Sequence, residues 1–466
     1  MTFAELVLGL SIPLMIGVFF VMPPLSACLL VVLSGEMFLP VVTSFKIPLM
    51  PALDKHNLTY ICSFIGCLLR CPARVTKLPK EKWLVACAFL ALLGGALTGL
   101  TNTEALTFGA AVAPGMGIKD GLFVGINEVV PGCLAFYLGY MLFRGPRDIE
   151  RLLVGLGIAG IAYCPFAILE MRLSPQLMGW VYGIDLGQWN QGFRWGGYRP
   201  MVFMNHGLTL ARFFMVTTLA LFVLAKTRRH LLGLPVRLLA WFHAVILVLC
   251  RSTGAIVLGL VGGTLILFAK PKRQLLVASI LAISVFAYPW LRASNLFPVS
   301  DILGAAGTLD KDRSESLAFR FVNEDMLLAR AREKILFGWG TYGRNFVSDA
   351  SGSPISTVDG FWIITLGESG LAGLVVSFGV MLWPIVWARR HFRKYRNQVT
   401  LYPLAGLALI LALVMVDLIP NGLWAHYPYL FAGILMRGAR EWRPMESLDG
   451  IQSSEYKNQL STAESP

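Results

Sequence analysis

The sequence predicts an all-α fold, a polytopic bundle of about 12 or 13 transmembrane helices. The first observation is composition: of 466 residues, 56% are hydrophobic and only 14% are charged, and the mean hydropathy is +0.65. The second is that apolar runs recur along the chain, most of them near the ~18 to 20 residues that cross a bilayer. The third is that basic residues gather in short loops between alternate runs, as on the cytoplasmic side of membrane proteins.

Twelve apolar runs are long enough to be predicted spans, and a thirteenth is short. The short run at 57–69 provides about two-thirds of a span, so it is a full, tilted or half-inserted helix, and the side on which residue 1 lies stays open. Glycines at 95 and 99, at 117, 121 and 125, and at 259 and 263 favour close packing between helices. The longer runs lie at 5–22, 24–44, 83–100, 121–143, 151–170, 205–225, 232–250, 253–269, 274–291, 370–388, 400–417 and 421–437.

The net charge of +13 follows from the positive-inside pattern, and a nucleic-acid partner is not predicted. The basic clusters lie at 70–82, 144–151, 226–237, 270–273 and 388–396. Threading the chain through them places 101–120, 171–204, 251–252, 292–369 and 418–421 on the outer face. The predicted regions are transmembrane helices at 1–291 with an outer loop at 171–204, a long outer loop at 292–369, C-terminal transmembrane helices at 370–437, and a disordered cytoplasmic tail at 438–466.

Neither a disulfide framework nor a bound metal or other cofactor is predicted. The eight cysteines lie in or beside spans, and none lies between 292 and 357. Cys67 and Cys71 share a helix face, but a metal site needs more converging ligands. The "DKD" at 310–312 has an Asp-x-Asp spacing that is common by chance.

Arg251 is an outer-side residue that the positive-inside pattern does not explain. In "LVLCRSTGAIVLGL" it is, apart from His243, the only ionisable residue between Trp241 and Lys270. A lone arginine at a helix end can extend to lipid headgroups. Alternatively, its planar and always-charged fork suits a phosphate or diphosphate, which makes Arg251 a candidate anion clamp.

A second polar set precedes the predicted span at 205–225. The segment "YGIDLGQWNQGFRWGGYRPMVFMNHGLTLARFF" contains Arg194, Arg199 and His206 among several aromatic residues. Aromatic rings with scattered hydrogen-bonding groups are typical of a sugar-binding surface, and the alternative is an aromatic belt at the membrane interface. His206, at the head of an apolar helix, is either a site residue or a structural histidine.

The sequence of the long outer loop predicts an amphipathic helix within the loop and a helix break at its end. Residues 315–334 mix apolar and charged side chains at helical spacing, so this part is expected to lie on the membrane surface. Arg320 and Glu324, four residues apart, are either substrate-binding residues or a helical ion pair. One helix over 358–388 would be ~46 Å long, well beyond the ~30 Å hydrocarbon core, so we expect a break at "GESG", 367–370.

Four further candidates lie in or near the outer segments. Asp359 stands at the start of the short helix expected before the break, where the dipole favours a carboxylate, so it is either a cap or a proton acceptor. Trp362 follows it, and Arg344 precedes it in "GWGTYGRNF". Glu128, in "GINEVVPGC", lies about two turns inside a predicted span. A carboxylate within the membrane indicates a functional site.

The order of these segments resembles the O-antigen ligase and O-antigen polymerase superfamily of bacterial envelope proteins. The resemblance rests on "RPMVFMNHG" before a span, "CRSTGA" at an outer turn and a long outer loop ending "VDGFWIITLGESGLAGL", within residues 85–435. It implies a GT-C-like glycosyltransferase of the inner membrane with its active site facing the periplasm. The implied donor is a polyprenyl-diphosphate-linked glycan, and the implied acceptor is a glycan or a lipid-linked acceptor.

The resemblance also assigns residues. The family's arginine at the outer turn maps onto Arg251, and the arginine before the mid-chain span maps onto Arg199. Ligase-like members often have a His-Asn pair where this chain has Asp359 and Gly360. This departure fits a polymerase of exopolysaccharide or O-antigen repeat units better than a ligase acting on lipid A core.

The chemistry of such a transfer gives each candidate a role. Displacing a diphosphate from an anomeric carbon needs stabilisation of negative charge, which Arg199, Arg251 and Arg344 can provide without a metal. Asp359 or His206 is the candidate base for the acceptor hydroxyl. The candidate substrate-binding residues are Arg344, Arg320, Glu324, Arg194, Glu128 and Trp362.

Two other classes of function stay open. One is a lipid-linked oligosaccharide flippase, although such transporters tend to have related halves and short outer loops, and this chain has neither. The other is a non-catalytic subunit for envelope assembly.

Overall fold

The computed structural model describes most of the chain between residues 2 and 441. The described part is largely helical, and its strands form four two-stranded hairpins: β1 (Ser44–Phe45) with β2 (Leu53–Asp54), β3 (Leu106–Phe108) with β4 (Ala111–Ala113), β5 (Phe193–Arg194) with β6 (Gly197–Tyr198), and β7 (His230–Leu231) with β8 (Leu234–Pro235). The residues outside the description are 1, 48–49, 77–80, 109–110, 188–191, 310, 350, 352, 354, 358, 394–398, 423–424 and 442–466, together with the side chains of 108, 111, 128–129, 309, 311–313 and 399.

Within the described residues, seven helices are long and apolar enough to cross a membrane: α1 (Phe3–Val21), α5 (Lys82–Thr101), α6 (Ile118–Leu142), α7 (Pro146–Leu173), α9 (Gly207–Leu224), α12 (Pro271–Ala293) and α15 (Phe361–Phe392). Shorter apolar helices are α2 (Pro24–Phe38), α10 (Val236–Leu249), α11 (Thr253–Phe268) and α16 (Tyr402–Asp417). The other helices are α3 (Lys55–Arg70), α4 (Pro72–Val75), α8 (Leu177–Tyr182), α13 (Val299–Leu309), α14 (Lys311–Arg332), η2 (Val399–Leu401) and α17 (Tyr427–Arg440).

Every predicted apolar run therefore falls on a helix, and the predicted all-α fold of a multi-pass membrane protein is confirmed at this level. The physical basis is that a chain segment within lipid must satisfy its own backbone hydrogen bonds, which a helix does. The number of helices that span the membrane stays a prediction. Most of the predicted tail at 438–466 lies outside the described residues.

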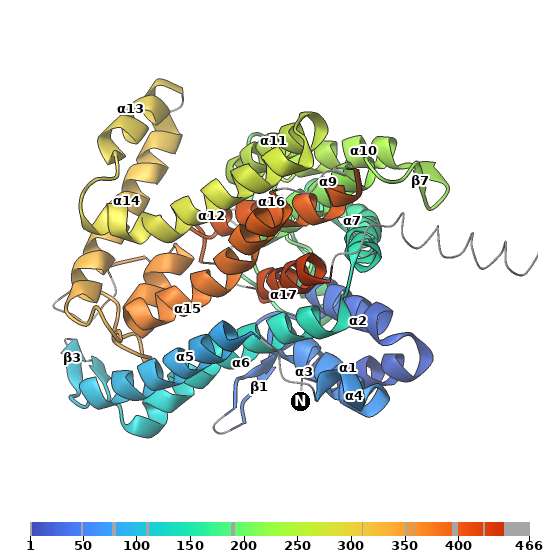
Figure 1. The fold of residues 1–466 in the computed structure, drawn as a ribbon. Coiled ribbons are helices and arrows are strands. Elements are labelled where there is room, and N and C mark those ends of the chain that lie inside the picture. The colour runs from blue at the N-terminus through green and yellow to red at the C-terminus, as the bar shows by residue number, and fades with distance from the viewer. Residues whose placement is uncertain are drawn as a thin grey trace, which may run out of the picture.

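The helices pack into one bundle, in which α5 and α6 lie side by side and α12 runs beside α15 (Figure 1). Glycines bring α5 and α6 into direct backbone contact. A Cβ on Gly95 would lie 2.6 Å from the amide nitrogen of Gly125, and a Cβ on Gly99 would lie 2.4 Å from the carbonyl oxygen of Gly117. The predicted small-residue packing at these positions is confirmed.

α15 is interrupted where the sequence predicts a break. Gly370 has φ 63° and ψ −159°, which is a non-helical conformation. The chain at 335–340 passes through the break, where the Leu371 amide donates to the Ile335 carbonyl at 2.8 Å. A Cβ on Gly370 would lie 2.5 Å from the carbonyl of Leu336, so only glycine permits this close approach.

The segment predicted as a long outer loop contains two helices, α13 and α14, which extend beyond the rest of the bundle at the upper left of Figure 1. The predicted helix at 315–334 is confirmed, since α14 covers most of it. The alternative of an ion pair between Arg320 and Glu324 is wrong. Glu324 instead accepts from Arg292 Nε of α12 at 3.1 Å, and Arg320 pairs with Asp359 at 3.5 Å. Contacts with neighbouring elements thus replace the local i, i+4 pair.

Candidate functional site

Three arginines from separate segments surround the start of α9. Arg194 lies on β5, Arg199 follows β6, and Arg320 lies on α14. The charges of all three act on His206, which is the N-cap residue of α9. We call Arg194, Arg199 and Arg320 the arginine cluster. Because the N-terminus of a helix carries a partial positive charge, the cluster and α9 together form a strongly electropositive region.

Arg199 is the most buried member of the arginine cluster, with an exposed fraction of 2%. Its side chain lies against the first residue of α9, since a Cβ on Gly207 would come within 2.7 Å of Arg199 Cδ. Burial and, next, the charge of Arg194 lower the pKa of Arg199 to about 10, which leaves the guanidinium charged at neutral pH. Its Nε and Nη2 have no hydrogen-bond partner among the described residues. A buried charged group of this kind is costly unless a ligand provides acceptors.

His206 is held in one tautomer. Its Nδ1 accepts from the Leu208 amide at 2.9 Å, so in the neutral ring the proton lies on Nε2. Burial and, next, the charge of Arg199 lower the pKa of His206 to about 4, so the ring is neutral at pH 7. A ring whose Nε2 already carries a proton serves as a hydrogen-bond donor there. This geometry makes His206 a weaker candidate for the base than Asp359.

Asp359 lies beside the arginine cluster. Its Oδ2 is 3.5 Å from Arg320 Nε, and the two side chains are 38% and 30% exposed. The alternative that Asp359 caps α15 is wrong, because the N-cap residue is Gly360 and no side chain caps this helix. The carboxylate therefore contacts α14 and is also partly exposed to solvent. Asp359 is thus a predicted base candidate that is partly exposed and in contact with the arginine cluster.

A buried ion pair, which sequence reasoning missed, lies on the next turn of α9. Arg212 Nε is 3.3 Å from Asp417 Oδ2 at the end of α16, and both side chains are less than a tenth exposed. Asp417 also accepts from Asn421 Nδ2 at 2.9 Å. The sequence did contain a signal for this pair: a single arginine and a single aspartate each lie in an otherwise apolar run. Charged residues in such runs are rare and tend to pair with each other.

Glu170 of α7 holds the loop that carries Arg199. The buried carboxylate accepts from the amides of Met201 at 2.7 Å and Val202 at 2.6 Å. Val202 has φ 55°, a conformation that a β-branched residue rarely adopts. The two hydrogen bonds compensate for this strain, and such compensation is common at functional sites. Sequence analysis did not single out Glu170.

Arg251 stabilises the β5–β6 hairpin. Its Nη1 donates to the Arg194 carbonyl at 2.5 Å and also to the carbonyl of Trp195. The hairpin turn has positive φ at Trp195 (50°) and Gly196 (70°), as a type I′ turn requires. A Cβ on Gly197 would lie 2.2 Å from Arg251 Nη2, so the glycine permits this approach. In this geometry Arg251 is a positioning residue for Arg194.

Substitution of Arg251 by lysine is expected to lower the glycan transfer that the family resemblance implies by about tenfold, with unchanged protein level. An ammonium cannot reproduce the guanidinium geometry between two carbonyls, and one such charge-assisted hydrogen bond contributes ~1.5 to 3 kcal/mol. Initial rates of transfer by purified protein check this. Near-normal product length and amount from a well-expressed variant would remove Arg251 from the site.

Three other predicted site residues make contacts away from the arginine cluster. Arg344 donates to the carbonyls of Pro114 at 2.8 Å and Glu104 at 3.0 Å, and these contacts hold the segments flanking β3 and β4. Trp362 is buried and donates from Nε1 to Glu324 at 3.3 Å. These partners indicate structural roles for Arg344, Trp362 and Glu324.

The side chain of Glu128 lies outside the described residues. Among the residues that are described, no group of three or more His, Cys, Asp or Glu side chains could hold a metal ion. Comparisons with protein-family models and with curated proteins gave no match to this chain. The site is therefore interpreted from its geometry and from the sequence pattern.

Proposed function

We propose that this protein is a membrane glycosyltransferase that polymerises or transfers glycan repeat units from a polyprenyl-diphosphate carrier. The observation that carries the proposal is the buried Arg199 guanidinium within the arginine cluster at the start of α9; two of the guanidinium nitrogens have no partner among the described residues. A diphosphate would provide acceptor oxygens for these guanidinium nitrogens and negative charge to balance the arginines. Arginines that already surround the leaving group can stabilise the charge that develops on it, as preorganised donors do in other enzymes.

Asp359 is the base in this proposal. The acceptor hydroxyl gives its proton to the Asp359 carboxylate while its oxygen bonds to the anomeric carbon. The bond from that carbon to the diphosphate breaks, and the polyprenyl diphosphate leaves with the electron pair. Arg320 contacts Asp359 and belongs to the arginine cluster, so one residue joins the base to the leaving-group site.

A small apolar cavity lies beside the site. It is lined by side chains of α2, α7, α9 and α17, including Thr209, Phe213 and Val216 on α9. Arg212, of the buried ion pair, directly precedes Phe213. The cavity volume of about 50 Å³ is too small for a prenyl chain, so the cavity is not a binding site for the lipid part of a polyprenyl-linked donor.

The proposed location is the bacterial inner membrane, with the arginine cluster on the periplasmic side. The positive-inside distribution supports this orientation. We also propose 13 spans with residue 1 outside. Lys55, at the start of α3, contacts the Phe203 carbonyl before α9, whereas Val75, beyond the end of α3, contacts Tyr137 of α6, so α3 extends between separate parts of the bundle.

Purified protein in lipid nanodiscs, supplied with a polyprenyl-diphosphate glycan, tests the proposal. Longer glycans on the carrier are expected if it is a polymerase. Transfer to a lipid acceptor without elongation would indicate a ligase instead. Movement of the lipid-linked glycan across a vesicle membrane without transfer would support the flippase alternative, and neither transfer nor movement would support an assembly subunit.

A cysteine at Ser351 is expected to react with a membrane-impermeant thiol reagent added to intact cells with a permeabilised outer membrane. Ser351 is exposed and lies in the long outer loop. The background protein has its native cysteines replaced. The matched control is Thr227→Cys, an exposed position in a predicted cytoplasmic loop, which should react only after the inner membrane is opened. The reverse pattern would overturn the orientation.

A further inference from the structure

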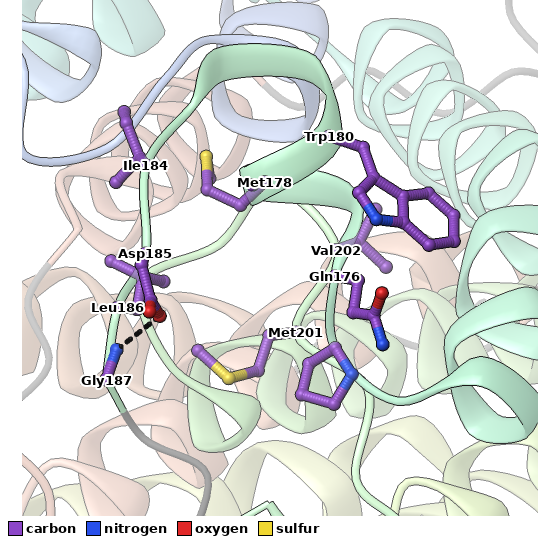
Figure 2. A pocket seen from close by; sticks show the side chains of 11 residues that line it. Gln176, Met178, Trp180, Ile184, Asp185, Leu186, Gly187, Met201 and Val202 are labelled. Carbon is purple, nitrogen blue, oxygen red and sulfur yellow. Dashed lines mark hydrogen bonds between the residues drawn. The ribbon is translucent and has the colours of Figure 1, made fainter.

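A second cavity lies at the loop between α7 and α9, outside the arginine cluster. It has a volume of about 290 Å³ and is lined mainly by α8, the residues around it and the pair Met201 and Val202. Figure 2 shows Trp180 and Gln176 on one side of the opening and Asp185 on the other, with Met201 between them at the lower edge. Trp180, Asp185 and Gln176 are not members of the arginine cluster.

Polar groups in this cavity are held in fixed orientations. Asp185 Oδ1 accepts from the Gly187 amide at 2.9 Å, which leaves Oδ2 to accept from a ligand. Gln176 Nε2 donates to the Leu173 carbonyl at 3.0 Å and to Ser174 Oγ at 2.7 Å, which leaves its carbonyl oxygen for a ligand. The cavity therefore offers acceptors for hydroxyl groups, together with an apolar surface.

Trp180 provides a large apolar face at the rim, since its exposed fraction is 59%. An indole with its polar edge free to solvent packs well against a ligand that has one apolar face and polar edges. A sugar ring is such a ligand, because its C–H bonds form an apolar face and its hydroxyls point outward. An aromatic ring opposite a carboxylate and beside an amide matches both parts of a sugar unit.

The floor of the cavity connects it to the proposed active site. Met201 and Val202 line the cavity and donate to buried Glu170, and Arg199 is two residues before Met201. A ligand in the cavity therefore lies against the same strained loop that positions Arg199. A substrate with a sugar unit near its diphosphate or along its glycan could contact both.

We infer that the cavity lined by Trp180, Asp185 and Gln176 is a saccharide subsite, which binds one sugar unit of the glycan and not its diphosphate. The inference rests on the proposed glycosyltransferase function. Trp180 stacks on the sugar ring, while Asp185 and Gln176 accept from its hydroxyls. By binding one sugar unit, the subsite positions the diphosphate of the same substrate at the arginine cluster.

Calorimetric titration of the purified protein with two probes tests the inference. The first probe is the free oligosaccharide released by mild acid from the polyprenyl-diphosphate glycans of the producing cells, and the second is inorganic pyrophosphate. Trp180→Ala is expected to weaken oligosaccharide binding by about tenfold or more, as loss of a tryptophan that packs on a ligand commonly does, and to leave pyrophosphate binding unchanged. Asp185→Asn is expected to weaken oligosaccharide binding as well.

Trp290→Ala is the matched control, because Trp290 is 51% exposed on α12 and lines neither cavity. It should bind both probes as the unchanged protein does. Equal oligosaccharide affinity in Trp180→Ala, or no oligosaccharide binding by the unchanged protein, would overturn the subsite. Oligosaccharide binding that depends on Trp180, in a protein that neither binds pyrophosphate nor transfers glycan, would retain the subsite and overturn the glycosyltransferase proposal.

Discussion

Replacement of Arg199 by lysine is expected to lower glycan transfer by about ten- to hundredfold while the protein still inserts into the membrane. Arg199 is buried, and its Nε and Nη2 have no hydrogen-bond partner within the part of the chain that the structure describes. Lysine has a single ammonium in place of the planar fork, so it loses the bidentate geometry for a diphosphate. A charge-assisted hydrogen bond is worth ~1.5 to 3 kcal/mol, and ~1.4 kcal/mol corresponds to a factor of ten in rate or affinity.

Two measurements check this result: the initial rate of glycan elongation at matched protein amounts, and the affinity for pyrophosphate. Both should decrease together if Arg199 binds the leaving group. The matched control is Arg172→Lys, because Arg172 is exposed near the end of α7 and belongs to no cluster described above. Unchanged pyrophosphate affinity in the Arg199 variant would show that the guanidinium does not contact the diphosphate.

Asp359→Asn is expected to reduce transfer by about 10²- to 10⁴-fold, the usual contribution of a positioned general base. Asparagine has nearly the same shape as aspartate, but its amide does not accept the hydroxyl proton. The change also removes the ion pair with Arg320. Because both partners are about a third exposed, that pair contributes only ~0 to 1 kcal/mol to stability, and the fold should persist.

The rate of transfer and the thermal stability of the purified Asp359→Asn protein are the quantities to measure. Asp359→Glu keeps the carboxylate and should retain part of the activity. Asp301→Asn, at an exposed position on α13, controls for a change in net charge and should behave as the unchanged protein does. An Asp359→Asn protein with a normal rate would leave the proposed reaction without its base.

The elements of the fold were largely predictable because their signals are local. A run of apolar residues specifies a helix within lipid, since the backbone has no other way to satisfy its hydrogen bonds there. The break in α15 was also predictable, because a helix over 358–388 exceeds the thickness of the hydrocarbon core and "GESG" offers flexible residues at the right depth. Glycine spacing likewise predicted the close contact of α5 with α6.

The candidate site was predictable only in part. Arg194, Arg199 and His206 lie within 13 residues of one another, so their proximity could be expected from the sequence. Asp359 was predicted as either a cap or a base, and the cap is excluded because Gly360 is the N-cap residue of α15 and no side chain caps this helix. The roles of Arg344 and Trp362 were not predictable, because each depends on a partner from a distant part of the chain.

The sequence by itself determined the all-α class, the apolar segments that become helices and the break in α15. Only the tertiary structure decided that Arg320 pairs with Asp359, that Arg212 pairs with Asp417, and that Glu170 holds the loop before α9. The physical reason is the range of each interaction. Helix formation and membrane insertion depend on a residue's neighbours in the chain, and periodicity shows which residues share a helix face. Which other helix packs against that face depends on how all the helices fit together, and every buried charge then takes the partner that this packing brings within reach.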